Sequence, residues 1–334
     1  MNPRDEAAPL AVGLGESLLR LSAPGHERLN QVRHLDVHVG GAEMNGLIGL
    51  AALGFRCRWL TRLSDSPLGR RIAGHAAEHG VEPVVDWDAD ARAPRYFVEH
   101  GAPPRPSEVL YDRSWSAMTR LTASTFPWAE AARGAKVALS TGITCALGTG
   151  PAEAVRGFLA AAREAGARTV FDVNHRARLW TWEQSAPVLR RVLPEVDVLL
   201  TSRHDLLRLV EGAAEVEDTV ELARRAIKRW GHRVVVLRDT VQSGPGQITV
   251  SATAVTGEEM LTSAGHQAQV IDAFGAGDAA LAAFVATWLT GGGLAEALEA
   301  SAWASAFQHT VVGDAWQVLP ADLEGRGQSW RILR

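Results

Sequence analysis

Asp272-Ala-Phe-Gly-Ala-Gly-Asp278 leads directly into an apolar stretch from Ala279 to Leu289. Small residues at the first turn of a helix let backbone N–H groups face an anion, and the helix dipole favours negative charge there. Asp278 would stand at the start of this helix, where a carboxylate can accept a proton from an attacking hydroxyl group. The alternative is an N-cap aspartate behind a flexible loop. The segment taken alone does not separate these two interpretations.

The chain around this segment alternates between predicted strands and predicted helices. Short apolar runs typical of buried strands are followed by stretches with helical periodicity. This alternation indicates a largely parallel sheet covered on both faces, in which ligands bind beyond the carboxyl ends of the strands. The predicted strands are Leu10 to Leu14, Phe55 to Leu60, Val137 to Ser140, Thr169 to Val173, Val196 to Leu200, Val234 to Leu237 and Gln247 to Ala252. The predicted helices are Glu43 to Leu53, Leu68 to Ala76, Pro151 to Gly166, Val220 to Trp230, Gly275 to Thr290 and Leu294 to His309.

Two segments depart from this alternation of strands and helices. Leu18 to Val39 has no helical periodicity and contains Pro24 and Gly25, so we expect short strands and turns there. Residues 86–118 place several prolines between Tyr96-Phe97-Val98 and Val109-Leu110-Tyr111. This pattern predicts a hairpin that stands off the main sheet.

The bulk properties exclude several classes of protein. The chain has 334 residues, enough for one large α/β domain or two smaller ones, and a net charge of -4 without a basic block, so nucleic acid is not an expected partner. The two cysteines, Cys57 and Cys145, have no metal-ligand spacing and are expected to be small buried residues. Met1 to Pro9 lacks the apolar stretch of a signal peptide, and no apolar run could span a bilayer. We therefore expect a cytoplasmic protein with no membrane partner.

Three further patterns place polar residues near predicted strand ends. Gly40-Gly41 would let the backbone approach a ligand closely, with Asn45 on the first helical turn, although the pair taken alone favours a plain strand-to-helix turn. Asp172, Asn174 and Arg176 alternate after a strand, so their side chains would share one face, and a guanidinium there could bind a carboxylate through two hydrogen bonds. Tyr111 and Arg113 share a strand face in the predicted hairpin, and with Tyr96 they could cover a polar ligand. For each arginine, a solvated surface charge is the alternative.

Taken together, these motifs resemble the ribokinase-like (PfkB) carbohydrate kinases over nearly the whole chain. Gly40-Gly41 with Asn45 resembles the N-terminal glycine motif of that family, and Asp272 to Asp278 resembles its C-terminal signature. The resemblance implies a three-layer α/β/α sandwich with a mostly parallel central sheet and a small β-sheet lid. The core would comprise residues 1–16, 40–91 and 119–334, and the lid residues 17–39 and 92–118.

Within the family, the chain is most similar to 2-keto-3-deoxygluconate kinases. The narrower resemblance rests on Gly40-Gly41-Ala42-Glu43, Ser140-Thr-Gly-Ile-Thr144, Tyr111-x-Arg113 and Asp172-Val-Asn-His-Arg176 followed by Leu179-Trp180. It implies transfer of the γ-phosphoryl group of ATP to a primary hydroxyl of a small sugar acid. Asp278 would be the general base, and the amides of Gly275, Ala276 and Gly277 would form the anion hole. Mg²⁺ would bridge the phosphates, and a monovalent cation such as K⁺ would sit near Asp272 and the Gly313-Asp314 loop.

The resemblance also assigns residues to each part of the site. The implied substrate-binding residues are Gly40, Gly41, Asn45, Tyr96, Tyr111, Arg113 and Arg176. The implied nucleotide-binding residues are Asn174, Ser202, Asp205, Arg238, Thr240, Gly244 and Ser305. The implied metal ligands are Asp272 and Asp205. The lid strands would pair with another copy of the chain, giving a homodimer or a higher homo-oligomer.

The chain departs from the family pattern on its nucleotide side. Ser202 and Asp205 stand where the family has Asn-x-x-Glu, and Arg238 to Gly244 replaces a glycine-rich turn that meets the nucleotide phosphates. Phe274 takes a position at which the family favours threonine. These departures leave other hypotheses open: a kinase of a neutral sugar such as fructose or ribose, a nucleoside kinase, or a non-catalytic sugar- or nucleotide-binding member of the fold.

Overall fold

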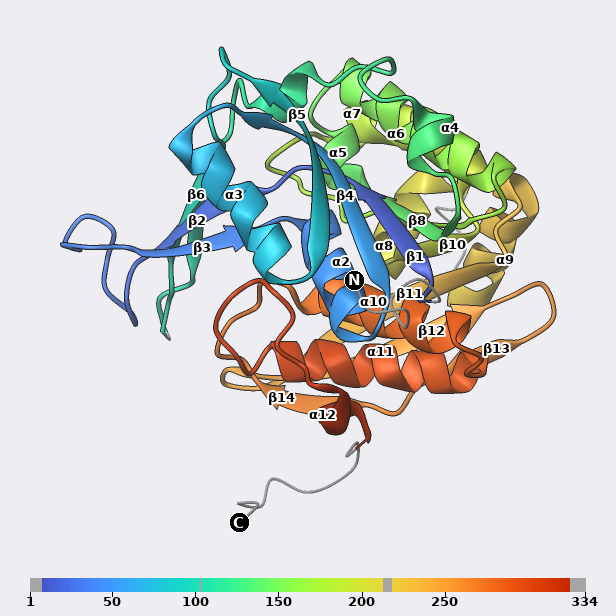
Figure 1. Cartoon of the computed structure of the whole chain (residues 1–334). Helices are drawn as coiled ribbons and strands as arrows, with labels where there is room; N and C mark the ends of the chain where they lie inside the picture. The colour runs from blue at the N-terminus through green and yellow to red at the C-terminus, as the bar shows by residue number, and fades with distance from the viewer. Residues whose placement is uncertain (1–7, 103, 213–217, 325–334) are drawn as a thin grey trace.

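A ten-stranded sheet forms the middle layer of the protein (Figure 1). The structure, a computed structural model, describes residues 8–102, 104–212 and 218–324, so both ends of the expected core domain and most of Met1 to Pro9 lie outside the described residues. The strand order is β13-β12-β11-β10-β9-β8-β1-β4-β5, with β14 beside β12. The strands from β11 to β5 along this order pair in parallel, whereas β12 to β14 are antiparallel. The bounds are β1 Leu10–Leu14, β4 Arg56–Ser64, β5 Val81–Asp88, β8 Ala135–Thr141, β9 Arg168–Asp172, β10 Val198–Thr201, β11 Val234–Gly244, β12 Gln247–Val255, β13 Met260–Thr262 and β14 His266–Gln269.

Helices cover both faces of this sheet, because its strands are apolar on both sides. On β1, Ala11 packs into one apolar cluster and Val12 and Leu14 into the other. The first cluster includes α2 (Ala42–Ala52), α3 (Pro67–Glu78), α10 (Ala276–Leu289) and α11 (Leu294–Gln308), with α12 (Pro320–Glu324) at its edge. The second includes α5 (Gly142–Cys145), α6 (Thr149–Glu164), α7 (Trp182–Val192), α8 (Arg203–Leu209) and α9 (Thr219–Trp230), with α4 (Trp128–Ala131) and the 3-10 helices Ala117–Arg120 and Leu193–Glu195. The predicted three-layer α/β/α sandwich is therefore confirmed.

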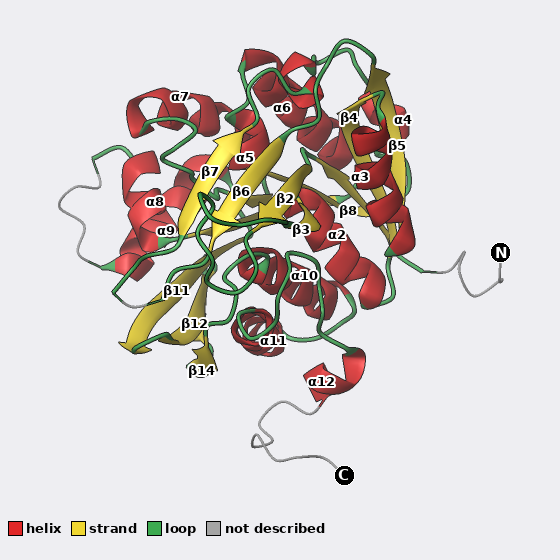
Figure 2. Ribbon diagram, turned by 90° about the vertical axis from the view of Figure 1, so that its left-hand side faces the viewer, coloured by secondary structure: helices red, strands yellow, loops and turns green. Residues whose placement is uncertain are grey.

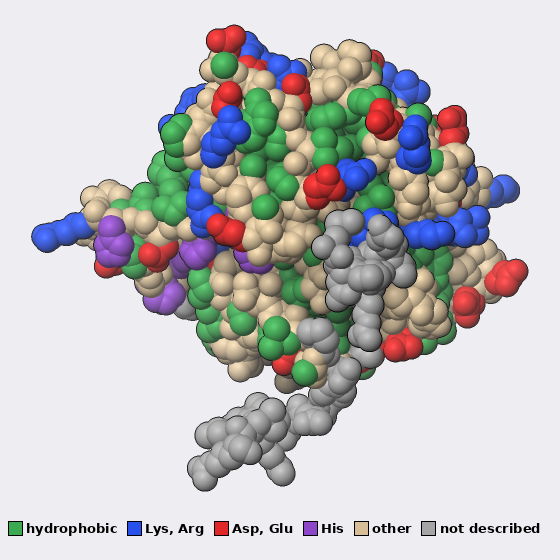
Figure 3. Space-filling view, in the orientation of Figure 1, with side chains coloured by type: hydrophobic (Ala, Val, Ile, Leu, Met, Phe, Trp, Pro, Cys, Tyr) green, Lys and Arg blue, Asp and Glu red, His purple; other side chains and the backbone are tan. Residues whose placement is uncertain are grey.

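A second, four-stranded sheet stands in front of the carboxyl ends of the central strands (Figure 2). We call it the lid sheet; its order is β3 (Asp36–Gly40), β2 (Leu18–Ser22), β6 (Arg95–Glu99) and β7 (Glu108–Asp112). The predicted hairpin is present as β6 and β7, with Tyr96 opposite Tyr111. β2 pairs with β6 in parallel and so joins the hairpin to the N-terminal segment. In the space-filling view this part of the molecule projects to the left, and histidine side chains gather along it (Figure 3).

One local expectation is wrong. The sequence predicts a strand that ends at Leu237 and a loop from Arg238 to Gly244, but β11 continues without interruption to Gly244. Residues 238–242 pair with residues 248–252 of β12, and the chain turns only at Gly244-Pro245-Gly246. The β-branched Thr240 and Val241 favour the extended conformation that allows this pairing.

Two smaller expectations concern the cysteines and the membrane. Cys57 and Cys145 are buried and form no disulfide, as the sequence predicts. No helix among residues 8–102, 104–212 and 218–324 has both the length and the apolar character needed to cross a membrane.

Candidate active site

The anion loop, residues 272–278, ends in the first turn of α10. Gly275 has a φ of 76°, and a Cβ atom there would come within 2.1 Å of the main-chain oxygen of Asp314. Only glycine combines this conformation with so close an approach. Ala276 and Gly277 follow in the first helical turn, where N–H groups have no main-chain acceptor within the helix. These N–H groups can therefore bind an anion.

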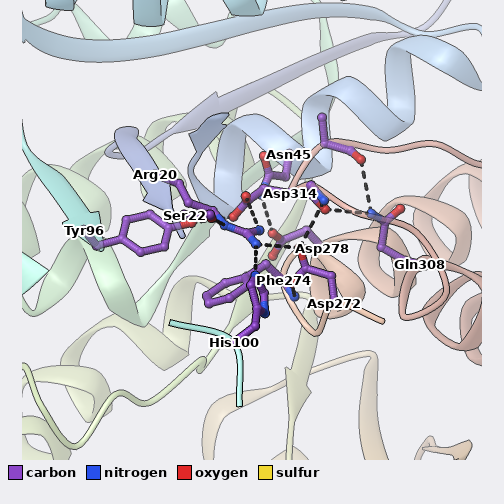
Figure 4. Close-up of polar contacts among 12 residues, drawn as sticks. Arg20, Ser22, Asn45, Tyr96, His100, Asp272, Phe274, Asp278, Gln308 and Asp314 are labelled. Carbon is purple, nitrogen blue, oxygen red and sulfur yellow. Dashed lines mark hydrogen bonds and ion pairs between the residues drawn. The ribbon is translucent and has the colours of Figure 1, made fainter. Parts of the chain in front are cut away.

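Asp278 lies in the same turn and lines a cavity. Its Oδ2 accepts a hydrogen bond of 2.8 Å from Nδ2 of Asn45, which α2 contributes (Figure 4). Burial raises the pKa of Asp278 to about 7, and the nearby charge of Asp172 acts in the same direction, whereas the Asn45 hydrogen bond lowers the pKa. A carboxylate with a pKa near neutrality is suited to act as a general base.

The glycine pair Gly40-Gly41 connects the lid sheet to α2 on the opposite wall of the pocket. A Cβ atom on Gly41 would lie 2.1 Å from Oγ of Ser17, and one on Gly40 would lie 2.6 Å from Oδ1 of Asp314. Neither position has room for a side chain. The pair therefore brings the backbone to the edge of the pocket and lets Asn45 face Asp278 from the first turn of α2.

A cavity of about 430 Å³ lies between the lid sheet, the anion loop and the ends of the central strands. Residues from every sequence motif meet in it. The predicted site residues that line it are Gly40, Gly41, Asn45, Tyr96, Tyr111, Arg113, Asn174, Arg176, Arg238, Thr240, Gly275, Ala276, Gly277, Asp278 and Ser305.

The two arginines predicted to bind a carboxylate have different surroundings. Arg113 is buried and ion-paired with Glu16, which also accepts a hydrogen bond from the hydroxyl of Ser116. Arg176 is exposed, lines the cavity and has no ion-pair partner among the described residues, and its charge lowers the pKa of Asp278. The charge of Arg176 can therefore meet an anionic group. Arg113 can offer its Nε, which is buried without a hydrogen-bond partner.

Asp172 and Arg238 close the floor of the cavity. Nη2 of Arg238 lies 2.7 and 2.8 Å from the two carboxylate oxygens of Asp172, and its Nη1 donates to the main-chain oxygen of Gly277 at 3.1 Å. The expectation that Asp172, Asn174 and Arg176 alternate along a strand is wrong, because β9 ends at Asp172 and Asn174 is left-handed, with a φ of 39°. The turn nevertheless brings all three side chains to the cavity.

Comparisons with known proteins agree with this geometry. The family described as pfkB family carbohydrate kinase matches residues 9–320. The 2-dehydro-3-deoxygalactonokinase of Haloferax volcanii is 34% identical over 323 residues, which cover 97% of this chain and 96% of that protein. The chain belongs to the PfkB family of carbohydrate kinases.

Two further similarities fit this family membership. The 2-dehydro-3-deoxygluconokinase of Thermoproteus tenax is 30% identical over 331 residues, covering 96% of this chain and 94% of that protein. The crystal structure of 2-dehydro-3-deoxygluconokinase from Thermotoga maritima has a TM-score of 0.89 and 31% identity, and the match covers 95% of this chain and 98% of that one. The prefixes 2-dehydro and 2-keto denote the same carbonyl group at carbon 2. These two relatives are therefore named as the kind of kinase that the sequence motifs resemble. The protein is thus a sugar kinase with a ribokinase-like fold.

Some predicted residues of this PfkB kinase lie outside the lining of the cavity. Ser202 caps α8, where its Oγ accepts a hydrogen bond from the N–H of Asp205. Gly244 lies at the far end of β11, about 20 Å along the strand from Arg238. Asp272, the first residue of the anion loop, is buried and does not line the cavity. Because β11 extends as a strand, the distal part of the predicted nucleotide segment points away from Asp278.

The two predicted metal ligands are Asp272 and Asp205. No group of three or more His, Cys, Asp or Glu side chains that could hold a metal ion occurs within the described ranges. Asp272 does not fit a Mg²⁺ ligand, because Oδ1 accepts from the N–H of Phe274 and Oδ2 accepts from the N–H of Gly313 and from Arg20. Asp205 is half-buried at the start of α8, and burial raises its pKa. Asp205, like Asp272, does not line the cavity.

Several residues of the kinase site were not predicted from the sequence. Glu16 follows the first strand directly, so its position at a carboxyl strand end could have suggested it. Ser251 lines the cavity because β11 continues far enough to bring β12 beside it, and His309 lines it from the end of α11. The sequence resemblance implies Asp314 only as part of the loop that would lie near a monovalent cation. Arg20, which pairs with it, left no signal in the sequence.

Proposed function

We propose that this kinase transfers the γ-phosphoryl group of ATP to a primary hydroxyl group of a small 2-keto-3-deoxy sugar acid, with 2-keto-3-deoxygluconate as the preferred acceptor. Asp278 takes the proton of the hydroxyl group as its oxygen attacks the γ-phosphorus, and ADP leaves. The amides of Gly275, Ala276 and Gly277 stabilise the charge that develops on the transferred group.

The observation that carries this proposal is the arrangement of Arg176 and Asp278 in one cavity. A guanidinium without a protein carboxylate partner favours an acceptor that brings its own carboxylate. Tyr96, Tyr111 and Arg113 line the same side and would hydrogen-bond the remaining oxygen atoms of the acceptor. A neutral sugar would leave the charge of Arg176 unmatched.

We place the nucleotide on the other side of the anion loop, where β11, β12 and α11 line the cavity. Thr240, Ser251 and Ser305 offer hydroxyl groups there, and none of them carries a charge. Arg238 is held by Asp172 at the border between the two sides. Mg²⁺ bound to the phosphates would supply the positive charge that this part of the cavity lacks.

A coupled ADP-release assay with Mg²⁺ and ATP tests the acceptor. We expect kcat/KM for 2-keto-3-deoxygluconate to exceed that for fructose, ribose and adenosine by about a hundredfold or more. The epimer 2-keto-3-deoxygalactonate, measured in the same assay, shows how strongly the enzyme discriminates between the two hydroxyl configurations. Turnover of fructose without turnover of either sugar acid would refute the proposed acceptor class, and absence of ADP with every acceptor would favour a non-catalytic protein.

The variant Arg176→Gln tests the carboxylate contact. We expect kcat/KM for the sugar acid to fall about tenfold to a hundredfold, because a hydrogen-bonded charge contact is lost, while turnover of any neutral sugar stays the same. Arg178→Gln is the matched control, because Arg178 is also exposed but does not line the cavity. An equal loss for acidic and neutral acceptors would contradict the role of Arg176.

A further inference from the structure

Arg20, on β2 of the lid sheet, has a fully buried side chain between two carboxylates (Figure 4). Its Nη2 lies 2.6 Å from Oδ2 of Asp272, and its Nη1 lies 2.9 Å from Oδ2 of Asp314. These contacts join residues 252 and 294 positions apart in the chain. A buried guanidinium is costly unless its charge and its N–H groups are matched, and here both are.

The remaining contacts of Arg20 complete its surroundings. Nε donates to Oγ of Ser22 at 2.8 Å, Nη2 lies 3.1 Å from Nε2 of His100, and the guanidinium carbon lies 4.3 Å from the ring centre of Phe274. A cation over an aromatic face is attracted by the quadrupole of the ring. Phe274, the bulky residue of the signature, therefore packs against this guanidinium, on a ring that also contacts Tyr96.

The carboxylate oxygens in this cluster all have hydrogen-bond donors. Oδ1 of Asp272 accepts from the N–H of Phe274 at 3.3 Å, and its Oδ2 accepts from the N–H of Gly313 at 3.1 Å as well as from the guanidinium. Oδ1 of Asp314 accepts from the hydroxyl of Tyr96 at 2.6 Å, and its Oδ2 accepts from the guanidinium. The guanidinium already supplies a positive charge between the two carboxylates, and a monovalent cation beside it would be repelled by that charge. The residues implied for a monovalent cation therefore do not fit one.

The cluster also holds the two segments that shape the anion loop. Asp272 begins the loop, and Asp314 provides the main-chain oxygen on which Gly275 packs. Without a cation, two carboxylates would stand behind a loop that must bind an anion, and their field would oppose that binding. Arg20 offsets one of these charges and ties the lid sheet to both segments.

We propose that Arg20 is a positioning residue that takes the place of a monovalent cation behind the anion loop, so that this kinase needs no free monovalent cation for activity. The inference rests on the proposed phosphoryl transfer at Asp278. It adds that this transfer depends on the guanidinium of Arg20 and not on a free monovalent cation. It also explains why a large aromatic residue at position 274 accompanies the loop.

The dependence of the wild-type enzyme on monovalent cations tests the inference directly. ADP release from Mg²⁺-ATP and 2-keto-3-deoxygluconate is measured in tetramethylammonium chloride and then in KCl or NaCl at the same ionic strength. We expect kcat to change by less than about twofold, because screening is the same in all three salts. Selective activation by K⁺ or Na⁺ of about fivefold or more, the scale of a true effector, would overturn the inference.

The variant Arg20→Met tests the same inference from the other side, because methionine keeps an unbranched apolar stem without the charge. We expect kcat to fall about a hundredfold, as when a donor at such a site is removed, with partial recovery in guanidinium chloride or KCl but not in tetramethylammonium chloride. Arg58→Met is the control: Arg58 also lies on a strand and pairs with Glu82 at 3.1 Å, but its side chain is 30% exposed, and we expect wild-type kcat.

The outcomes separate this inference from the proposed function. An Arg20→Met variant with wild-type kcat, or a folded variant whose loss no small cation repairs, would overturn the role of Arg20. If Arg20→Met does not fold, the salt series on the wild-type enzyme decides the question. Wild type that forms no ADP with any acceptor would refute the proposed function instead, whereas a K⁺-activated wild type would leave that function intact.

Discussion

The two ends of the anion loop each carry an aspartate, and the two carboxylates have opposite surroundings. Asp272 is paired with Arg20 and accepts main-chain N–H groups at both of its oxygens. Among the described residues, Asp278 has Asn45 as its hydrogen-bond partner, and burial raises its pKa to about 7. Two aspartates six positions apart in the chain thus differ in the donors that surround their carboxylates.

The comparison shows that the hydrogen-bond and ion-pair partners of an aspartate, and not the residue type, decide whether it can accept a proton from a substrate. A carboxylate whose two oxygens accept main-chain hydrogen bonds and that pairs with a buried cation is occupied by structural contacts. A carboxylate that is desolvated and lightly hydrogen-bonded binds a proton near neutral pH and can accept one from a substrate. The contacts of Asp272 therefore hold the loop in place, and Asp278 is the residue that we propose to react.

The largest effect is expected for Asp278→Asn, which removes the base and keeps the shape. We expect kcat to fall about a thousandfold or more, with ATP binding by calorimetry largely unchanged. Because the pKa of Asp278 is raised in the folded state, its ionisation opposes folding as the pH rises toward 7. The variant should therefore be as stable as the wild type at neutral pH or more so. Near-normal turnover would contradict the assignment of the base.

Asp272→Asn should give the complementary result, a loss of stability. Asparagine at position 272 loses the charge-assisted hydrogen bond to Arg20 and can accept through only one side-chain atom, which leaves buried donors without an acceptor. We therefore expect the free energy of unfolding to fall by about 2 to 3 kcal/mol in urea titrations. Asp112→Asn is the control, because Asp112 also meets two arginines, Arg92 and Arg95, but on the surface. Its loss should stay below about 1 kcal/mol. Equal losses would mean that burial does not distinguish the two sites.

The pH profile sharpens the comparison further. Because the base must be deprotonated, kcat/KM for the sugar acid should rise about tenfold per pH unit on the acidic side and level off above about 7. The charged groups that face Asp278 are Asp172 and Glu43, which raise its pKa, and Arg176, which lowers it. A profile without an acidic limb between about pH 5 and about 7 would speak against a perturbed carboxylate.

The smallest effect is expected for Asn45→Ala. The amide of Asn45 donates to the carboxylate of Asp278 and lowers its pKa, so its removal should move the midpoint of the pH profile upward by up to about one unit. At pH 7 this gives a few-fold loss of kcat/KM that is recovered at higher pH. A loss that persists at all pH values would assign Asn45 to substrate binding instead.

Much of the fold and part of the site could be predicted from local signals in the sequence. Buried strands, helices with a proline at the start or a glycine at the end, and the hairpin around Tyr96 and Tyr111 all depend on residues close together in the chain. The length of β11 could not be predicted in this way. Its continuation through Thr240 depends on pairing with β12, and the energy of that pairing cannot be read from one strand alone. The same pairing moved Gly244 away from the cavity.

The sequence by itself determined the small-residue turn before α10, the place of Asp278 in its first turn and the glycine pair that faces it, because glycine conformation and helix-start geometry are local properties. Only the tertiary structure decided which charges are matched. Arg20 lies between Leu19 and Leu21 in a short strand, and its partners Asp272 and Asp314 are 252 and 294 positions away. Ion pairs over such distances leave no local pattern, because their energy arises only when the fold removes both charges from water.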